Sequence, residues 1–375
     1  MERLTIPPRP GYAQKLEAIG LSFHAWDDYW QEGACYRFSA AEIDLLEEAA
    51  DDLHQRCLEA LAHVIAKGRL GELGIPPTFW PAITLSRLEN DFSLYGRFDF
   101  AYDGQSPPKL LEYNADTPTS LLESAIAQWH WLEDCHPEAD QFNSLHERLV
   151  ERWRALPGNG AVHFASLAGN EEDWVCATYL MDTLTQAGRT ARHIDIEDIG
   201  WDVRRNTFVD LDEQPITQLF KLYPWEWAMR EDFGRHIATA ATRFIEPLWK
   251  APLSSKGLLP ILWELFPDHP NLLPAFFSAN RLAAFARKPL FSREGANVEL
   301  YADGRLLARG DGPYGQEGHI YQALHPLPEF AGRYPVLGVW LVDGKSCGLC
   351  IREDTSPITT NQSQFIPHYF TPSEA

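Results

Sequence analysis

The chain has 375 residues, of which 45% are hydrophobic and 23% are charged, and its formal net charge is −21. This is the composition of a globular protein with a substantial core and roughly two or three structural lobes. Because phosphate neutralisation requires clustered Lys and Arg, we expect no nucleic-acid partner. The acidity would suit a cationic small molecule, although it is also a general solubility device.

The chain shows neither a basic segment followed by an apolar run near its N-terminus nor a stretch of about 18 apolar residues, so we expect no secretory signal and no membrane span. Six cysteines without disulfide-framework spacing indicate a reducing cytoplasm. Cys347 and Cys350 match C-x-x-C, which leaves a metal or redox site open. Residues 339–351 also predict a plain hairpin that turns at Asp343 and Gly344.

The first strong helix signal is a capping box from Ser39 to Glu42. Apolar residues then recur at helical spacing from Ile43 to Ile65, and Gly68 is a typical end. We interpret this helix as structural.

Two strands with a turn-rich segment between them predict a hairpin over 94–114. Since alternate residues of a strand share a face, Arg97 and Asp99 lie together, as do Glu112 and Asn114. A turn centred on residues 105–106 would place Asp99 opposite Glu112 and Arg97 opposite Asn114.

Carboxylates directly opposite each other on neighbouring strands repel, and on a covered face they need a compensating cation. Asp99, Glu112 and Asn114 offer oxygen ligands that suit Mg²⁺. The hairpin therefore predicts a magnesium site, unless this face is merely solvated.

A second capping box, Ser120 to Glu123, predicts a helix directly after the hairpin. Thr117 and Thr119 would lie in its entry turn. The unpaired N–H groups of the helix would form an anion site beside the metal.

Residues 161–196 predict a strand, a helix from about 171 to 187 and a parallel strand. Glu171, Glu172 and Asp173 crowd the first helical turn, where interaction with the helix dipole explains them. Residues 219–226 predict a strand edge, with Trp225 and Trp227 as core aromatics.

From Lys288 onward, short apolar strands alternate with turns, which predicts an antiparallel sheet. Lys288 precedes a loop that contains Gly295, and a plain β-turn would explain that glycine. Arg352 precedes two acidic residues and could form an ordinary surface ion pair with either.

Segments along nearly the whole chain match one family in the right order: RFDF at 97–100, EYNADTPT at 112–119, SSKGLLPILWELFP around Lys256, KPLFSREGAN from Lys288, IYQALHPLP at 320–328 and IREDTSPITTNQSQFIPHYF at 351–370. They resemble the synthetase domain of the glutathionylspermidine synthase family, ATP-grasp-type enzymes that join a carboxylic acid to an amine. Motifs of this length are much more specific than a single glycine pattern.

The resemblance implies roles for residues at the matching positions. Arg97 would be catalytic, Asp99, Glu112 and Asn114 would hold Mg²⁺, and Thr117, Thr119, Glu171, Glu172 and Arg352 would bind substrate. ATP would contact Arg97, Phe98, Asp99, Lys256, Lys288, Gly295, Ala296, Gln322 and Ile358.

The implied fold is mixed α/β and α+β, ATP-grasp-like, with a pre-ATP-grasp strand–helix–strand region and a C-terminal antiparallel sheet. The approximate lobes are 1–155 with the metal hairpin, 156–250 for substrate and 251–375 for nucleotide. Bifunctional family members carry an additional N-terminal amidase domain, and we expect no such activity here.

The implied reaction is ATP- and Mg²⁺-dependent ligation through an acyl phosphate, possible substrates being a glutathione-like peptide and a polyamine-like amine. Two other hypotheses stay open at this point. One is a nucleotide-binding regulator that keeps the fold without turnover, and the other is a metal-dependent hydrolase that uses the same carboxylates.

Overall fold

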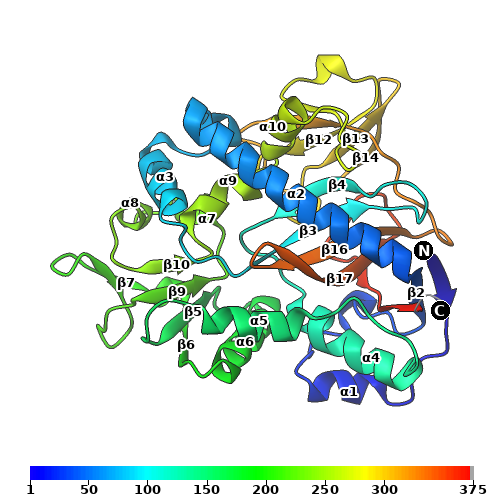
Figure 1. Cartoon of the computed structure of the whole chain (residues 1–375), viewed down its shortest axis with the longest axis horizontal. Helices are drawn as coiled ribbons and strands as arrows, with labels where there is room; N and C mark the ends of the chain where they lie inside the picture. The colour runs from blue at the N-terminus through cyan, green and yellow to red at the C-terminus, as the bar shows by residue number, and fades with distance from the viewer. Residues whose placement is uncertain (372–375) are drawn as a thin grey trace.

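Helices and strands alternate in the computed structural model, which describes residues 1–371 and has a mixed α/β fold with several sheets (Figure 1). The expectation of a mixed fold is therefore confirmed. The helices are α1 (Tyr12–Ala18), α2 (Ala40–Lys67), α3 (Trp80–Leu88), α4 (Gln128–Cys135), α5 (Leu145–Arg154), α6 (Glu171–Gln186), α7 (Trp225–Ala228), α8 (Gly234–Ile237), α9 (Ala251–Ser254) and α10 (Leu258–Leu265).

The central sheet joins the predicted hairpin to strands from the last third of the chain. Its order is β18-β17-β16-β3-β4, and β3 pairs antiparallel with both β4 and β16. The strands are β3 (Tyr95–Ala101), β4 (Lys109–Asn114), β16 (Tyr334–Val342), β17 (Lys345–Asp354) and β18 (Gln364–Phe365).

The predicted register of the β3–β4 hairpin is confirmed. Asp99 pairs with Glu112 and Arg97 pairs with Asn114. Between Asp99 and Phe100 the pairing of β3 with β4 shifts by one residue, as at a β-bulge. The four polar side chains therefore share one face of the sheet.

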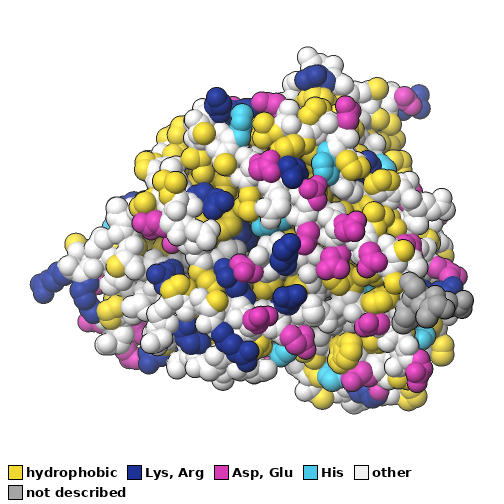
Figure 2. Space-filling model, in the orientation of Figure 1, with side chains coloured by type: hydrophobic (Ala, Val, Ile, Leu, Met, Phe, Trp, Pro, Cys, Tyr) yellow, Lys and Arg dark blue, Asp and Glu magenta, His cyan; other side chains and the backbone are white. Residues whose placement is uncertain are grey.

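Helix α2 covers the opposite face of the central sheet (Figure 1). Phe98 and Tyr113 are buried on that face, with ring centroids 4.2 Å apart. The helix begins with the predicted capping box of Ser39 and Glu42, and it ends at Gly68, whose φ is +65°. Figure 2 shows acidic side chains gathered over the outer face of this helix.

The predicted capping box at Ser120 is wrong, although a helix does follow. Ser120 has a left-handed φ of +72°, and a π-helical turn spans Glu123–Ala127 before α4. Glu123 is buried and accepts a hydrogen bond from Tyr29 Oη at 2.6 Å. Its carboxylate is held by this distant tyrosine instead of reaching back to the start of the helix.

The predicted strand–helix–strand unit is confirmed, with β5 and β6 parallel and α6 between them. The strand near residue 219 is interior, because the sheet order is β10-β9-β5-β6. Trp225 is buried as expected, whereas Trp227 is half-buried. The strands are β5 (Val162–Ser166), β6 (Ala191–Asp195), β9 (Gln218–Lys221) and β10 (Arg243–Ile245).

The expected antiparallel C-terminal sheet is present in the order β11-β15-β12-β13-β14. It lies beside β4 at the top of Figure 1. Its strands are β11 (Ala275–Phe276), β12 (Phe285–Pro289), β13 (Glu299–Ala302), β14 (Arg305–Arg309) and β15 (His319–Ala323).

The two ends of the described chain meet in a small sheet of order β1-β2-β19. None of the helices within residues 1–371 is both long and apolar enough to span a membrane. All six cysteines carry free thiols, including Cys347 and Cys350 on β17. The remaining strands are β1 (Glu2–Thr5), β2 (Ala34–Ser39), β7 (Gly200–Asp202), β8 (Thr207–Val209) and β19 (His368–Thr371).

Candidate active site

A cavity of about 390 Å³ lies between the polar face of the hairpin and the C-terminal sheet. That volume is typical of a small-molecule site. Charged and aliphatic side chains both line it. Most of the predicted site residues are among them: Arg97, Asp99, Glu112, Asn114, Thr117, Thr119, Glu172, Lys256, Lys288, Gly295, Gln322, Arg352 and Ile358.

Arg97 and Asp99 form a two-bond ion pair on β3. Arg97 Nε lies 2.7 Å from Asp99 Oδ1, and its Nη2 lies 3.1 Å from Oδ2. Asn114 Nδ2 donates to the same Oδ2 at 2.9 Å. Burial raises the pKa of Asp99, and the Arg97 guanidinium opposes that rise. The third guanidinium nitrogen, Nη1, donates to the carbonyl oxygen of Thr119 at 3.1 Å.

Glu112 has a different cation. Lys256 Nζ lies 2.8 Å from its Oε2, and Asn114 Nδ2 lies 3.3 Å from its Oε1. Burial raises the pKa of Glu112, but the Lys256 ammonium, the Lys288 charge and the Asn114 hydrogen bond together outweigh burial and hold this pKa below its usual range. The Asn114 amide therefore bridges two carboxylates that are each matched by one positive charge.

Lys288 is buried beside these groups, and neutral oxygens hold its ammonium. It donates to the carbonyl oxygen of Leu111 at 2.9 Å and to Gln322 Oε1 at 2.7 Å. Gln322 Nε2 donates in turn to the carbonyl oxygen of Leu110 at 2.9 Å. Burial lowers the pKa of Lys288 to about 8, although the charge of Glu112 opposes this shift.

The donor chemistry of the polar face fits a hard metal ion. Asp99 and Glu112 provide carboxylate oxygens that suit Mg²⁺. Asn114 would add its amide oxygen once the side-chain amide turns, since its Nδ2 faces both carboxylates in this structure. Within residues 1–371, no group of three or more His, Cys, Asp and Glu could hold a metal. Phosphate or water oxygens would therefore have to complete the coordination.

The Gly295 loop touches the opposite wall of the cavity. Gly295 has a φ of +67°, and a Cβ there would lie 2.3 Å from the carbonyl oxygen of Thr359 and 2.6 Å from Ile358 Cγ2. A turn alone would explain the backbone angle. The close approach adds a packing reason for glycine at this position.

The turn after β4 connects to α6 and to the Gly295 loop. Thr119 Oγ1 donates to Glu172 Oε1 at 2.8 Å. Thr117 Oγ1 accepts a hydrogen bond from Arg293 Nη2. Both threonines therefore lie where the parallel-sheet region and the loop reach the cavity.

Three predicted residues do not line the cavity. Phe98 points into the core on the α2 side of the sheet. The Ala296 amide is already bonded to the carbonyl oxygen of Arg293 at 2.8 Å within the loop. Glu171 accepts a hydrogen bond from Ser22 Oγ, away from the cavity.

Arg352 forms hydrogen bonds in place of the surface ion pair that its acidic neighbours suggested. Its Nε donates to the carbonyl oxygen of Ser363 at 2.9 Å and its Nη2 donates to that of Thr360 at 3.2 Å. Glu353 is buried and pairs with Arg3 at 2.6 Å. The backbone of the final segment thus holds Arg352 at the cavity wall.

Two charged residues that line the cavity, Arg293 and Glu294, were not predicted from the sequence as site residues. Arg293 Nε lies 3.8 Å from Glu226 Oε1, so it connects the loop to α7. Burial and the charge of Glu172 both raise the pKa of Glu294, and they raise that of Asp173 to about 7. The position of both residues immediately before Gly295 was the available signal.

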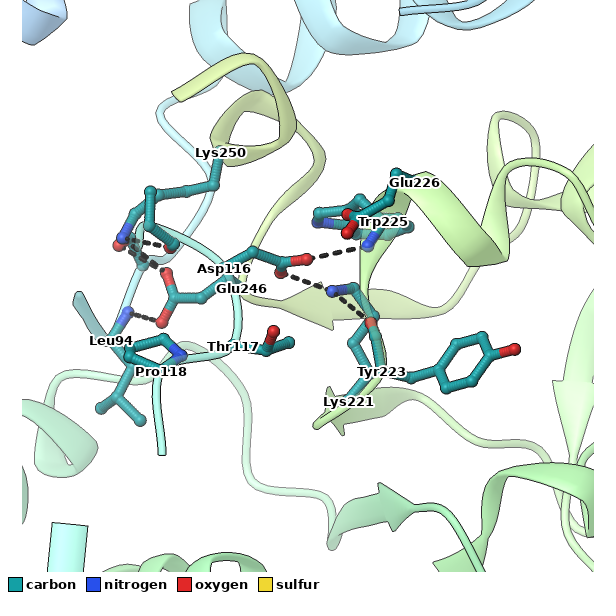
Figure 3. A network of polar contacts seen from close by, with 12 residues as sticks. Leu94, Asp116, Thr117, Pro118, Lys221, Tyr223, Trp225, Glu226, Glu246 and Lys250 are labelled. Atoms are coloured by element: carbon teal, nitrogen blue, oxygen red, sulfur yellow. Dashed lines mark hydrogen bonds and ion pairs between the residues drawn. The ribbon is translucent and has the colours of Figure 1, made fainter. Parts of the chain in front are cut away.

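A buried polar network fixes the turn that carries Thr117 (Figure 3). Asp116 Oδ1 lies 2.5 Å from Lys221 Nζ, and its Oδ2 accepts from the Trp225 amide at 2.8 Å. Nearby, Glu246 accepts from the amide of Leu94 at 2.9 Å, and Lys250 Nζ lies 3.2 Å from Glu246. The network connects both ends of the hairpin to β9 and β10 and to the segment leading into α9.

Relatives define the class of the protein. A Haemophilus influenzae protein named "Putative acid–amine ligase" is 42% identical, and the match covers 99% of this chain and all of that protein. Trypanothione synthetase of Crithidia fasciculata is 30% identical over 84% of this chain. The bifunctional glutathionylspermidine synthetase/amidase of Escherichia coli is 28% identical over 88% of this chain. The Haemophilus influenzae protein is named a ligase and the other two are named synthetases, so the expected class of enzyme, a ligase, is confirmed.

The chain belongs to the family described as glutathionylspermidine synthase preATP-grasp, whose model matches residues 3–371. The resemblance drawn from the sequence motifs is therefore confirmed. The chain spans 53% of the length of the Crithidia protein and 58% of the Escherichia coli protein. In a member of this ligase family, the cavity beside the hairpin is the candidate active site.

Proposed function

We propose that the chain is an ATP- and Mg²⁺-dependent carboxylate–amine ligase of ATP-grasp type that forms an amide bond through an acyl phosphate. One observation supports this most strongly: Arg97, Asp99, Glu112, Lys256 and Lys288 all line one cavity of suitable size. Two carboxylates and several cations around one space suit a metal-loaded triphosphate better than a neutral ligand.

In this proposal, Asp99, Glu112 and Asn114 hold Mg²⁺. Bound Mg²⁺ would neutralise phosphate charge and help to align the transferred group. Lys256 and Lys288 add point charges on the phosphates, and the Gly295 loop covers them. Aliphatic side chains that would form the wall for a purine ring also line the cavity, and these include Leu273, Val298, Leu324 and Ile358.

The reaction would proceed in two steps. A carboxylate oxygen of the acid attacks the γ-phosphorus of ATP, the bond to the β-phosphate oxygen breaks, and ADP leaves. A neutral amine then attacks the acyl carbon, loses a proton, and expels phosphate. Arg97 would stabilise the negative charge that develops in both steps. The loop would keep water from hydrolysing the acyl phosphate.

The rest of the cavity suits an acid at one wall and an amine at another. Arg352 presents a planar guanidinium that can bind a carboxylate, and Thr117 and Thr119 add hydroxyl groups. Glu172 and Glu294 provide negative charge for a cationic amine. We therefore propose small-molecule substrates, with a glutathione-like peptide and a polyamine-like amine as the first pair to test, and a cytoplasmic enzyme.

The test is ADP release with Mg²⁺ and ATP, measured with and without pools of acids and amines. Glutathione and other γ-glutamyl peptides form the acid pool, and polyamines and small amino acids form the amine pool. ADP that depends on both pools supports ligation. Nucleotide binding without ADP in any combination would instead support a regulatory protein, and product formed without ATP would support a hydrolase.

Two conservative substitutions test the metal assignment. Asp99→Asn and Glu112→Gln should leave the protein folded, with some loss of stability because each leaves a largely buried cation without its partner. Both should abolish Mg²⁺·ATP-dependent turnover, because each removes a charged oxygen ligand without changing side-chain shape. Full ATP-dependent ligation by the Asp99→Asn protein would overturn the assignment.

A further inference from the structure

The two carboxylates that the hairpin contributes to the cavity, Asp99 and Glu112, are each paired with a cation of the chain itself. The Arg97 guanidinium engages both oxygens of Asp99, at 2.7 and 3.1 Å, while the Lys256 ammonium lies 2.8 Å from Glu112 Oε2. The two pairs differ in mobility: a two-bond fork resists rotation, whereas a single ammonium can exchange partners.

Lys256 is attached to the loop as well as to the carboxylate. Its Nζ donates to the carbonyl oxygen of Ser292 at 2.8 Å, and its backbone amide donates to that of Leu290 at 2.8 Å. The lysine side chain is 6% exposed, and that of Glu112 is 26% exposed. A cation that enters the cavity can therefore reach Glu112, but it must compete with the Lys256 ammonium that already compensates the Glu112 charge.

Lys288 provides an internal comparison. It lies in the same cavity, yet its ammonium donates to the carbonyl oxygen of Leu111 and to Gln322 Oε1. Both acceptors are neutral. Removing the Lys288 charge changes the local potential without freeing a carboxylate, whereas removing the Lys256 charge frees Glu112.

We propose that Lys256 is an exchangeable counter-ion, which occupies Glu112 until a triphosphate draws its ammonium away. Metal and nucleotide would then bind cooperatively, and either one alone would bind weakly. This inference rests on the proposed nucleotide site and adds an order of events to it. Departure of the Lys256 ammonium would also release the Ser292 carbonyl, so the same exchange would free the loop to close over phosphates.

The first test is metal binding without nucleotide. Mn²⁺ has the same preference for oxygen ligands as Mg²⁺ and is counted directly by the electron paramagnetic resonance of the free ion. The wild-type protein should bind Mn²⁺ weakly. Lys256→Met should bind it at least about fivefold more tightly, within the usual range for coupling between sites. Lys288→Met, the matched control, should show a smaller change.

The reciprocal test is nucleotide binding without metal. Glu112→Gln keeps the shape of the side chain and frees the Lys256 ammonium. In EDTA it should bind a non-hydrolysable ATP analogue at least about fivefold more tightly than the wild-type protein. This gain should disappear in the Lys256→Met background, because a double-mutant cycle isolates the pair.

The outcomes separate this inference from the proposed function. Equal Mn²⁺ affinity of Lys256→Met and the wild-type protein, or a Glu112→Gln gain that persists without Lys256, would overturn the exchange and leave the nucleotide site standing. A wild-type protein that binds the analogue neither with nor without Mg²⁺ would overturn the proposed function itself. Circular dichroism of each variant checks its folding. If Lys256→Met is unfolded, the Glu112→Gln single variant decides the matter, because an analogue affinity in EDTA equal to that of the wild-type protein would overturn the exchange.

Discussion

Asp99 and Glu112 face each other across the hairpin, yet their surroundings shift them in opposite directions. Burial outweighs Arg97 at Asp99 and raises its pKa, whereas Lys256, Lys288 and Asn114 together outweigh burial at Glu112 and lower that pKa. Two neighbouring carboxylates can therefore have pKa values that are shifted in opposite directions. Burial dominates at Asp99 and the neighbouring cations dominate at Glu112, so substitutions of the cations test the two carboxylates separately.

Arg97→Lys should reduce turnover by about 100-fold, because a lysine cannot hold Asp99 through two bonds and also offer N–H groups to the developing charge. The affinity for nucleotide should change much less, since Lys256 and Lys288 remain. Single-turnover kinetics and equilibrium binding of an ATP analogue separate the two effects. Parallel losses in rate and affinity would instead place Arg97 in ground-state binding.

Lys288 gives the site a pH dependence. Burial lowers its pKa to about 8, so the ammonium is charged below pH 8 and becomes neutral as the pH rises through that value. Only the charged form attracts phosphate, and nucleotide affinity should therefore fall as the pH rises above 8. In Lys288→Arg the charge persists at every accessible pH, so this decline should vanish in calorimetric titrations from pH 7 to 9. An unchanged decline in that variant would assign it to another group.

The Gly295 loop and the β13–β14 turn both contain a glycine with positive φ, in different surroundings. Gly295 has φ +67° and touches the 358–359 segment, whereas Gly304 has φ +71° and open space around it. Both glycines therefore have a left-handed backbone that would strain another residue. Of the two, only Gly295 contacts the cavity wall.

Gly295→Ala and Gly304→Ala should each lose about 1 kcal/mol of stability from the left-handed backbone. Gly295→Ala should also push the loop away from the wall, because its Cβ would lie 2.3 Å from the Thr359 carbonyl oxygen. We expect a raised KM for ATP in this variant and an unchanged KM in Gly304→Ala. Steady-state kinetics on both proteins measures the difference, and equal KM values would mean that the loop does not cover nucleotide.

At the scale of the whole molecule, the cavity exists because segments far apart in sequence share a sheet. β3 pairs with β16, so the hairpin from the first third of the chain and the strands that carry Cys350 and Arg352 line the same space. The ends of the described chain are also joined, by β1, β2 and β19 and by the ion pair of half-buried Arg3 with buried Glu353.

The sequence predicted what depends on local pattern. Alternation and a turn were sufficient for the Asp99–Glu112 register, and cap residues were sufficient for α2. The sequence-based prediction failed where residues far apart in the chain determine the local structure. Tyr29 donates a hydrogen bond to the Glu123 carboxylate, which therefore does not form the predicted capping box. Likewise, the pairing of Lys256 with Glu112 depends on tertiary packing that no local motif encodes.

The buried pair of Lys221 and Asp116 holds the parallel sheet to the turn after β4, and it provides a test of this long-range architecture. Their side chains are 3% and 2% exposed. Lys221→Met leaves a buried carboxylate without its cation, which should cost about 3–5 kcal/mol of unfolding free energy. Lys345→Met removes the exposed partner of Asp51 and should cost only about 0–1 kcal/mol.

Urea denaturation of both variants measures this contrast. Because Asp116 immediately precedes Thr117 in the cavity wall, Lys221→Met should also weaken substrate binding, even though Lys221 lies outside that cavity. Replacing both members of the pair, as Lys221→Met with Asp116→Leu, should recover part of the lost stability, since no buried charge is then left unmatched. Equal, small losses for Lys221→Met and Lys345→Met would show that the pair does not hold the sheets together.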